Sequence, residues 1–182
     1  MYTSLEIEFK TAIDDDTYIS LLKEFNLVDK VNKQTNFYFD TPDLKLIKNH
    51  IILRIREKDY NVKLTSKTPT GEGTLERHIL LTKDEQNKML KEGFDASVIE
   101  INEYVHNVAK LETYRAKTSY KSGTLFFDKN VYYDTVDYEI EFEVADEELG
   151  KKEFLEFLKE HNITYKKMVS KSKRAYKKSS QI

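Results

Sequence analysis

The sequence predicts an α+β protein built on a closed antiparallel β-barrel of about eight strands, with helices packed on its outside. Three observations lead to this prediction. Apolar and charged residues alternate with period two in many segments, which is typical of strands with two different faces. Charges of one sign repeat along single strand faces, and several amphipathic helices need an apolar surface to cover. A barrel with charges inside and apolar faces beneath helices satisfies all three.

Length and composition restrict the classes of protein to consider. The chain has 182 residues, which fits one domain over residues 1–182. Its 30 Lys and Arg residues nearly balance 32 Asp and Glu residues, which argues against a nonspecific nucleic-acid binder. Cysteine is absent, so disulfides and thiolate metal sites are excluded. No apolar run is long enough to cross a bilayer and no signal-peptide pattern is present, so we expect a cytoplasmic protein without a membrane partner.

The N-terminal half supplies most of the expected strands. The first, Leu5–Lys10, alternates three apolar residues with three charged ones. A helix is indicated next by apolar residues at helical spacing, namely Tyr18, Leu21, Leu22 and Phe25. Further strands are expected at 35–40, 51–57, 61–67 and 74–81.

The C-terminal half mixes helices and strands. Thr82 and Glu85 form a capping-box pattern and Gly93 is a stop signal, so a helix is expected over 83–92. Two more helices are expected, over about 97–110 and over 146–160, and a basic tail covers 161–182. Strands are expected at 112–120, from 123, at 130–133 and at 137–144.

The charged faces of these strands carry both signs. The acids are Glu6, Glu8, Glu76, Asp128, Glu139, Glu141 and Glu143. The bases are Lys10, Arg54, Arg56, Lys63, Arg115 and Lys117, with one late lysine expected to join them. If these faces were solvated, the apolar faces would have to fill a barrel core. The repeated like charges on one face and the amphipathic helices favour the opposite arrangement, in which an ionic lumen is enclosed.

An ionic lumen of this composition matches a metal-bound polyphosphate. Arginine and lysine complement phosphate oxygens, and clustered carboxylates suit Mg²⁺ or Mn²⁺. No glycine-rich phosphate loop and no Ser–His–Asp or Cys–His arrangement can be identified. His78 shares the face of Glu76, but a single histidine of this kind is assigned no role.

The ordered set of these residues resembles the CYTH superfamily, the triphosphate tunnel metalloenzymes, and in length the stand-alone bacterial type. The hallmark is the strand Glu6-Ile7-Glu8-Phe9-Lys10. The pieces that follow in the same order are the segment 36–46, Arg54 with Arg56, Lys63, Glu76, Arg115 with Lys117, Asp128, Glu139 with Glu141 and a C-terminal lysine segment. The resemblance covers essentially the whole chain and implies a tunnel-shaped barrel.

The resemblance also implies residue roles. Metal would be held by Glu6, Glu8, Glu139 and Glu141, with Asp128 as a further ligand. Phosphates would be bound by Lys10, Arg54, Arg56, Lys63, Arg115, Lys117 and either Lys171 or Lys173. Glu76 could be a metal ligand or the charge partner of an arginine, and Glu143 is assigned to the rim or surface. Glu6, Glu8, Lys10 and Glu141 would carry catalysis.

These roles favour a phosphohydrolase that uses Mg²⁺ or Mn²⁺ and acts on small-molecule triphosphates, with inorganic triphosphatase as the first hypothesis. Class IV adenylate cyclase, thiamine triphosphatase and RNA 5′-triphosphatase are alternatives within the same family. A noncatalytic polyphosphate- or nucleotide-binding module is an alternative of another class. By analogy with the family, the chain could form a homodimer.

Overall fold

The computed structural model describes residues 1–179 and contains one sheet of nine strands. The strands are β1 (Tyr2–Ile13), β2 (Asn32–Asp40), β3 (Ile52–Lys58), β4 (Asn61–Pro69), β5 (Thr74–Leu81), β6 (Phe94–Asp95), β7 (Tyr104–Tyr120), β8 (Gly123–Tyr132) and β9 (Thr135–Val144). Their hydrogen-bonded order is β2-β3-β4-β5-β1-β9-β8-β7-β6. Because β2 also pairs with β7, eight strands close into an antiparallel barrel and β6 is an extra strand on β7. The predicted fold class is confirmed.

Five helices connect or follow these strands. They are α1 (Asp15–Glu24), α2 (Lys45–Lys48), α3 (Lys83–Glu92), α4 (Glu147–Glu160) and α5 (Lys171–Ser179), with 3₁₀ turns η1 (Val28–Lys30) and η2 (Ala96–Ile99). The capping box predicted for α3 is present, because Thr82 accepts from the Glu85 backbone and Glu85 accepts from Thr82. Within residues 1–179, no helix has the length and apolar character needed to cross a membrane.

The helix predicted over about 97–110 is wrong. This segment contains the short turn η2 and then the first residues of β7. Some apolar residues of this segment have helical spacing, namely Val98, Ile101, Val105 and Val108. The same segment also contains the alternation of a strand. Val105, Ala109 and Leu111 are buried at alternate or near-alternate positions of a strand, and tertiary packing decides between the two.

Two smaller expectations also need correction. The short strand expected at 130–133 is the end of β8, which runs without interruption from Gly123 to Tyr132. The C-terminal tail, for which the sequence predicts only a basic segment, contains the helix α5. Ser172 and Ala175 of α5 are buried, so packing of one small-residue face stabilises this helix.

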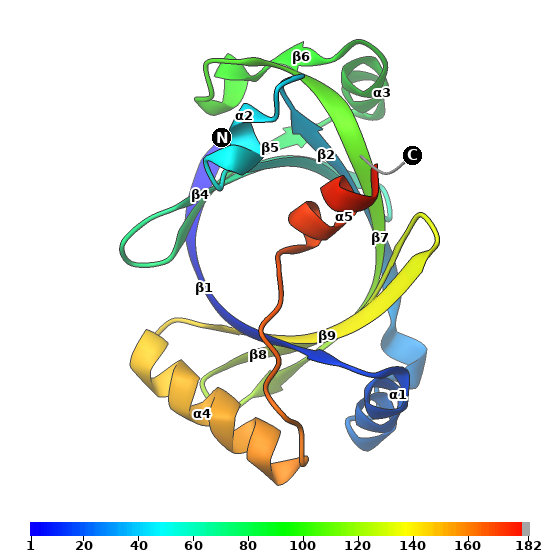
Figure 1. Ribbon diagram of the computed structural model, residues 1–182, viewed down its shortest axis with the longest axis vertical. Helices are drawn as coiled ribbons and strands as arrows, with labels where there is room; N and C mark the ends of the chain where they lie inside the picture. The colour runs from blue at the N-terminus through cyan, green and yellow to red at the C-terminus, as the bar shows by residue number, and fades with distance from the viewer. Residues whose placement is uncertain (180–182) are drawn as a thin grey trace. The chain divides into compact units, whose positions relative to one another are not determined.

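The chain divides into two units, each with its own hydrophobic core. Unit 2 comprises residues 6–33 and 113–169. Its core joins α1 and α4 to one face of β8 and β9, and Phe127, Phe142 and Phe157 are its largest fully buried side chains. Figure 1 shows α1 and α4 on the same side of the β8–β9 pair. The opposite face of these strands carries the charged residues.

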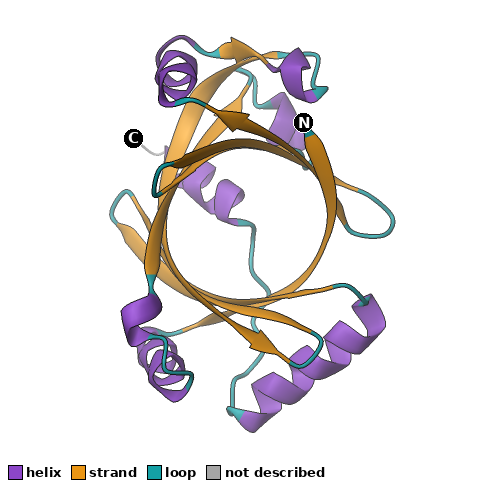
Figure 2. Cartoon of the chain, turned by 180° about the vertical axis from the view of Figure 1, so that it is seen from behind, coloured by secondary structure: helices purple, strands orange, loops and turns teal. Residues whose placement is uncertain are grey.

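Unit 1 comprises residues 1–5 and 34–112, together with the described residues from 170 onward. Its core is formed by alternate residues of β2, β3 and β4 and by η2, with Phe39, Leu53 and Leu64 fully buried. Figure 2 shows α3 and the helical turn that follows β6 on one side of these strands. As in unit 2, the charged residues occupy the other strand face, so the predicted separation of the two faces is observed in both units.

Candidate functional site

The acidic residues of unit 2 are brought together by the pairing of β9 with both of its neighbours. Glu143 is paired with Glu8 of β1, and Glu141 is paired with Lys10. On the other side, Glu139 is paired with Asp128 of β8. Paired residues of antiparallel strands point to the same face, so one surface collects side chains that are far apart in the sequence.

These acids form two groups of three. One group is Glu6, Glu8 and Glu143, which are half-buried, and the other is Asp128, Glu139 and Glu141, which are buried. In each group the candidate oxygen atoms lie within 4.8 Å of one another. Carboxylate oxygens at this spacing are the donors that hard divalent cations such as Mg²⁺ and Mn²⁺ prefer. The side chains present therefore fit a divalent metal.

Arg115 neutralises much of the buried group. Its Nε and Nη2 donate to the two oxygens of Asp128 at 2.7 and 2.6 Å, and Nη2 also donates to Glu141. Burial disfavours the charge of Arg115, but Asp128 and Glu141 more than compensate and raise its pKa. The resemblance implies that Arg115 contacts phosphate, yet these contacts occupy its guanidinium with carboxylates. Lys117, two residues along β7, is exposed.

Not all of the acidic charge is compensated. Burial raises the pKa of Glu141 to about 7, and although Arg115 opposes this effect, the charges of Glu8 and Asp128 add to it. Burial and the neighbouring Glu6 raise the pKa of Glu143 to about 7 as well. Lys10 donates to Glu8 at 2.5 Å and is the second cation of this face. Such a surface is stabilised by additional positive charge.

The sequence predicts Glu143 at the rim or surface, whereas the structure groups it with Glu6 and Glu8. The alternation of β9 already contained the signal, because Glu139, Glu141 and Glu143 must share one face. What the sequence did not provide was the register with β1, which sets Glu143 opposite Glu8.

The basic residues lie on the polar face of unit 1 in two rows across the strands. One row runs through Asn36, Arg56 and Lys63, and Arg56 Nε donates to Asn36 Oδ1 at 3.0 Å. The pKa of Lys63 is lowered by burial and by the nearby charges of Arg56 and Arg54. The three predicted phosphate ligands of β3 and β4 are thus neighbours that repel one another.

The second row runs through Tyr38, Arg54, Thr65 and His78. His78 is buried, and its ring nitrogens are hydrogen-bonded to Thr65 Oγ1 and Ser4 Oγ, each at 3.1 Å. The Tyr2 ring lies on it with a centroid distance of 4.7 Å. These contacts give His78 a structural role that the sequence did not indicate.

Glu76 is the main acid of this basic face. Its Oε1 forms an ion pair with Lys67 Nζ at 2.5 Å, and its Oε2 lies 3.1 Å from His78 Nε2. The sequence pattern does not indicate Lys67 as a partner, but the pairing of β4 with β5 sets it directly opposite Glu76. Glu76 is therefore placed as a charge partner, and its ion pair is with a lysine rather than with an arginine.

The two candidate late lysines have different surroundings. Lys173 Nζ donates to His50 Nδ1 at 3.0 Å, next to the end of α2, whereas Lys171 is half-buried at the start of α5. Arg174, which the sequence interpretation did not select, lies close enough to Tyr38 for its charge to act on the phenol. The helix α5 thus brings the charge of an arginine close to Tyr38.

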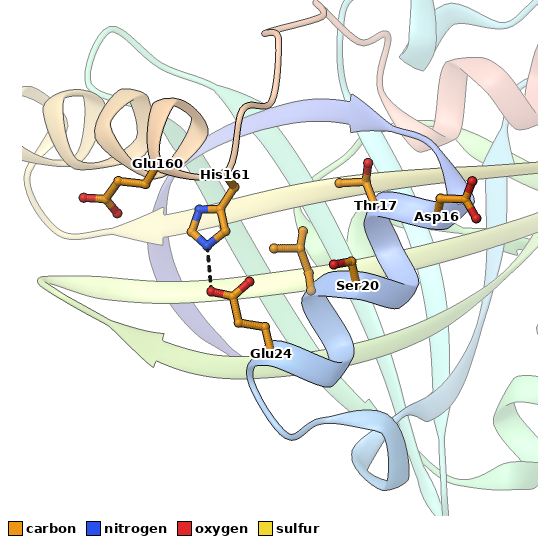
Figure 3. Close-up of a pocket in the computed structure, with 7 residues that line it drawn as sticks. Asp16, Thr17, Ser20, Glu24, Glu160 and His161 are labelled. Atoms are coloured by element: carbon orange, nitrogen blue, oxygen red, sulfur yellow. Dashed lines mark hydrogen bonds and ion pairs between the residues drawn. The ribbon is translucent and has the colours of Figure 1, made fainter.

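A separate cavity of about 620 Å³ lies between α1 and the end of α4 in unit 2. Figure 3 shows Glu24 and His161 as its central pair, with His161 Nε2 3.1 Å from Glu24 Oε1. Asp16, Thr17 and Ser20 line its α1 side. None of the predicted site residues lines this cavity, so it is distinct from both charged faces.

Comparison with known proteins agrees with this arrangement. The family model named CYTH domain matches residues 4–176. The chain belongs to the CYTH domain family. The resemblance recognised from the ordered charged residues is confirmed.

Individual CYTH relatives cover nearly the whole chain. YjbK of Bacillus subtilis strain 168, which carries a provisional triphosphatase name, is 30% identical and the match spans 97% of this chain and 96% of YjbK. A Bacillus halodurans protein described provisionally as an adenylate cyclase is 32% identical, with coverage of 96% and 98% and a TM-score of 0.88. The Hippeastrum protein HpAC1 shares the fold at 22% identity, 96% coverage of both chains and a TM-score of 0.74; its description gives it a dominant triphosphatase activity.

Proposed function

We propose that this CYTH protein is a divalent-metal-dependent phosphohydrolase of triphosphates, with inorganic triphosphate as its principal substrate. The observation that carries the proposal is the separation of charge on the polar strand faces. Two groups of three carboxylates occupy unit 2, and the two rows that contain Arg54, Arg56 and Lys63 occupy unit 1. The triphosphatase name of the relative YjbK supports the hydrolytic reading.

In this proposal the metal is Mg²⁺ or Mn²⁺. Asp128, Glu139 and Glu141 would hold it, and Glu6, Glu8 and Glu143 offer a second set of ligands. When bound, the cation would act as a Lewis acid toward phosphate oxygens and lower the pKa of a coordinated water. Arg115 orients the Asp128 and Glu141 carboxylates through its hydrogen bonds and opposes the rise in the pKa of Glu141, so it favours the charged form that a metal ligand requires.

Arginine and lysine side chains of the chain would bind the substrate's phosphates. Arg54, Arg56 and Lys63 bind the phosphate oxygens and stabilise the negative charge that develops on the phosphoryl group and on the leaving diphosphate. Lys10, which is held by Glu8, is assigned to the same task, as are Lys117 and Lys171. Water attacks the terminal phosphorus, its bond to the bridging oxygen breaks, and orthophosphate and diphosphate leave.

A second candidate is an adenylate cyclase, because the Bacillus halodurans relative carries that provisional description. The two functions differ in their products. Purified protein should be incubated with inorganic triphosphate, ATP or thiamine triphosphate, with Mg²⁺, with Mn²⁺ or with a chelator. Metal-dependent release of orthophosphate, fastest from inorganic triphosphate, is the expected result. Cyclic AMP and diphosphate from ATP would instead identify a cyclase, and binding without turnover would identify a noncatalytic module. Cytoplasmic location and dimerisation stay predictions.

A further inference from the structure

The guanidinium of Arg115 lies within the buried carboxylate group of unit 2. Its Nη2 donates to both Asp128 and Glu141, and its Nε donates to the other oxygen of Asp128 at 2.7 Å. These two acids and Glu139 form the group whose candidate oxygens lie within 4.8 Å of one another. Arg115 therefore already supplies a positive charge at the place where these carboxylates could hold a metal ion.

The aromatic ring of Phe126 positions this guanidinium. Both chain neighbours of Phe126 on β8 belong to the hydrophobic core, so Phe126 itself lies on the charged face, together with Asp128. The register pairs Phe126 with Glu141. The Cζ atom of Arg115 lies 4.4 Å from the centroid of the Phe126 ring, which is a cation–π contact. An aromatic residue on an otherwise ionic strand face thus holds the arginine beside its carboxylate partners.

Arg115 and a divalent cation would repel each other strongly at these carboxylates. The side chain of Arg115 is 14% exposed, that of Glu141 is 8% exposed and that of Asp128 is fully buried, so little water screens the charges. Mg²⁺ binds carboxylate oxygens at about 2.0–2.1 Å, so it would lie beside the guanidinium. An arginine does not lose its proton in a protein, so its charge leaves the site only when the side chain moves.

Building on the proposed function, we propose that Arg115 is the resident cation of this carboxylate group in the metal-free protein. A divalent cation binds Asp128 and Glu141 there by displacing the guanidinium, which the ring of Phe126 otherwise holds in place. Arg115 favours the charged carboxylates until the metal replaces it, and its net effect is to weaken metal binding. A residue that only oriented the metal ligands would strengthen metal binding, so the sign of the change on removal of Arg115 separates the two roles.

Metal binding without substrate tests this inference. The affinity of the full chain for Mg²⁺ should be measured by calorimetry at pH 8.5, above the pKa of about 7 of Glu141. Arg115→Gln should bind Mg²⁺ about tenfold more tightly than the wild type, because the competing charge is gone. Arg115→Lys should lie between them, since it keeps the charge without the fork. Phe126→Leu should gain about two- to fivefold, because only the contact with the ring is lost.

Controls assign the gain to the buried group. Lys121→Gln removes another cation of unit 2, which pairs with Glu156 at 2.7 Å, and should leave the affinity for Mg²⁺ almost unchanged. Adding Asp128→Asn to Arg115→Gln should abolish the gain, because the released carboxylate is then missing. In Arg115→Ala, millimolar guanidinium ion should weaken Mg²⁺ binding by taking the place of the side chain, whereas the wild type should not respond to it.

Unchanged or weaker Mg²⁺ binding in Arg115→Gln, or a gain that survives Asp128→Asn, would overturn the inference. Thermal unfolding gives a second readout. Metal-free Arg115→Gln should melt below the wild type, because buried carboxylates lose their partner, and Mg²⁺ should raise its melting temperature more. If Arg115→Gln does not fold, the sign of the change in Phe126→Leu decides instead.

The proposed function fails separately from this inference. A wild type that does not hydrolyse triphosphate would contradict the proposed function, while tighter Mg²⁺ binding by Arg115→Gln would still support the role of Arg115.

Discussion

The two units use the same construction for opposite charge. In each, alternate residues of antiparallel strands form a hydrophobic core beneath helices, and the other strand face is ionic. In unit 2 this face carries six carboxylates and the two cations Arg115 and Lys10, so acids dominate. In unit 1 arginine and lysine dominate, and Glu76 is the main acid. The alternation of a strand determines the face on which a charged residue lies, but it does not determine whether that residue is acidic or basic. The sign of the charge can therefore differ between the two units without a change in the fold.

The units also differ in how their charge can be changed. Glu141 and Glu143 of unit 2 have pKa values raised to about 7, so their charge depends on pH near neutrality. Arginines cannot lose their proton in this range, so the charge of Arg54 and Arg56 is permanent. Metal and pH should therefore act mainly on unit 2, whereas anions and ionic strength should act mainly on unit 1.

The largest effect is expected from Glu141→Gln. The substitution keeps the side-chain size but removes a carboxylate from the buried group of unit 2. Metal-dependent triphosphate hydrolysis should fall about 10²- to 10³-fold, because the cation would lose a charged ligand. Steady-state phosphate release measures this. Glu148→Gln in α4, which removes an exposed carboxylate, is the control. Wild-type turnover in Glu141→Gln would show that the metal is bound elsewhere.

The next effect is expected from Arg56→Ala in unit 1. Loss of the guanidinium should weaken metal-free binding of inorganic triphosphate about ten- to one-hundredfold, with less effect at high salt. Arg77→Ala is the matched control, because Arg77 lies on the opposite face of β5 and pairs with Glu100 at 2.6 Å. Calorimetry should show unchanged affinity for this variant. Equal losses in both variants would mean that net charge, and not the face of the strand, determines binding.

The smallest effect concerns stability and pH in the metal-free protein. The raised pKa values of Glu141 and Glu143 mean that, between their ordinary values near 4.5 and about 7, the folded protein binds more protons than the unfolded chain. Raising the pH through this range should therefore lower the free energy of unfolding, by about 1–3 kcal/mol for the buried Glu141. Denaturant titrations between pH 5 and 8 in a chelating buffer measure this change.

The difference between wild type and Glu141→Gln isolates this contribution. The comparison is needed because the lowered pKa of His78 acts in the opposite direction. Adding Mg²⁺ should stabilise the wild type more at pH 8 than at pH 5, since ligand carboxylates must be deprotonated. A wild-type protein that gains stability relative to Glu141→Gln as the pH rises, without metal, would contradict the expected burial of this carboxyl.

Much of the fold and of the charged faces could be predicted because alternation is local. Glu139 and Glu141 are two residues apart in the chain, and their common face follows from strand geometry alone. Pairing between strands is not local. The registers that set Lys67 opposite Glu76 and Glu143 opposite Glu8 depend on turns and long connections, so their roles required the structure. The proximity of Arg174 to Tyr38 depends on how α5 packs against β2, which the sequence pattern does not show.

The strict alternation of β9 has a consequence for how this gene can change. Insertion or deletion of a single codon within the strand would move every residue beyond it to the other face. Glutamates of the charged face, such as Glu141, would then be replaced there by core residues such as Phe142. The hairpin between β8 and β9, at Tyr133 and Asp134, can lengthen without this inversion. We expect length differences among functional homologues to be confined to such turns, while the strands accept point substitutions only.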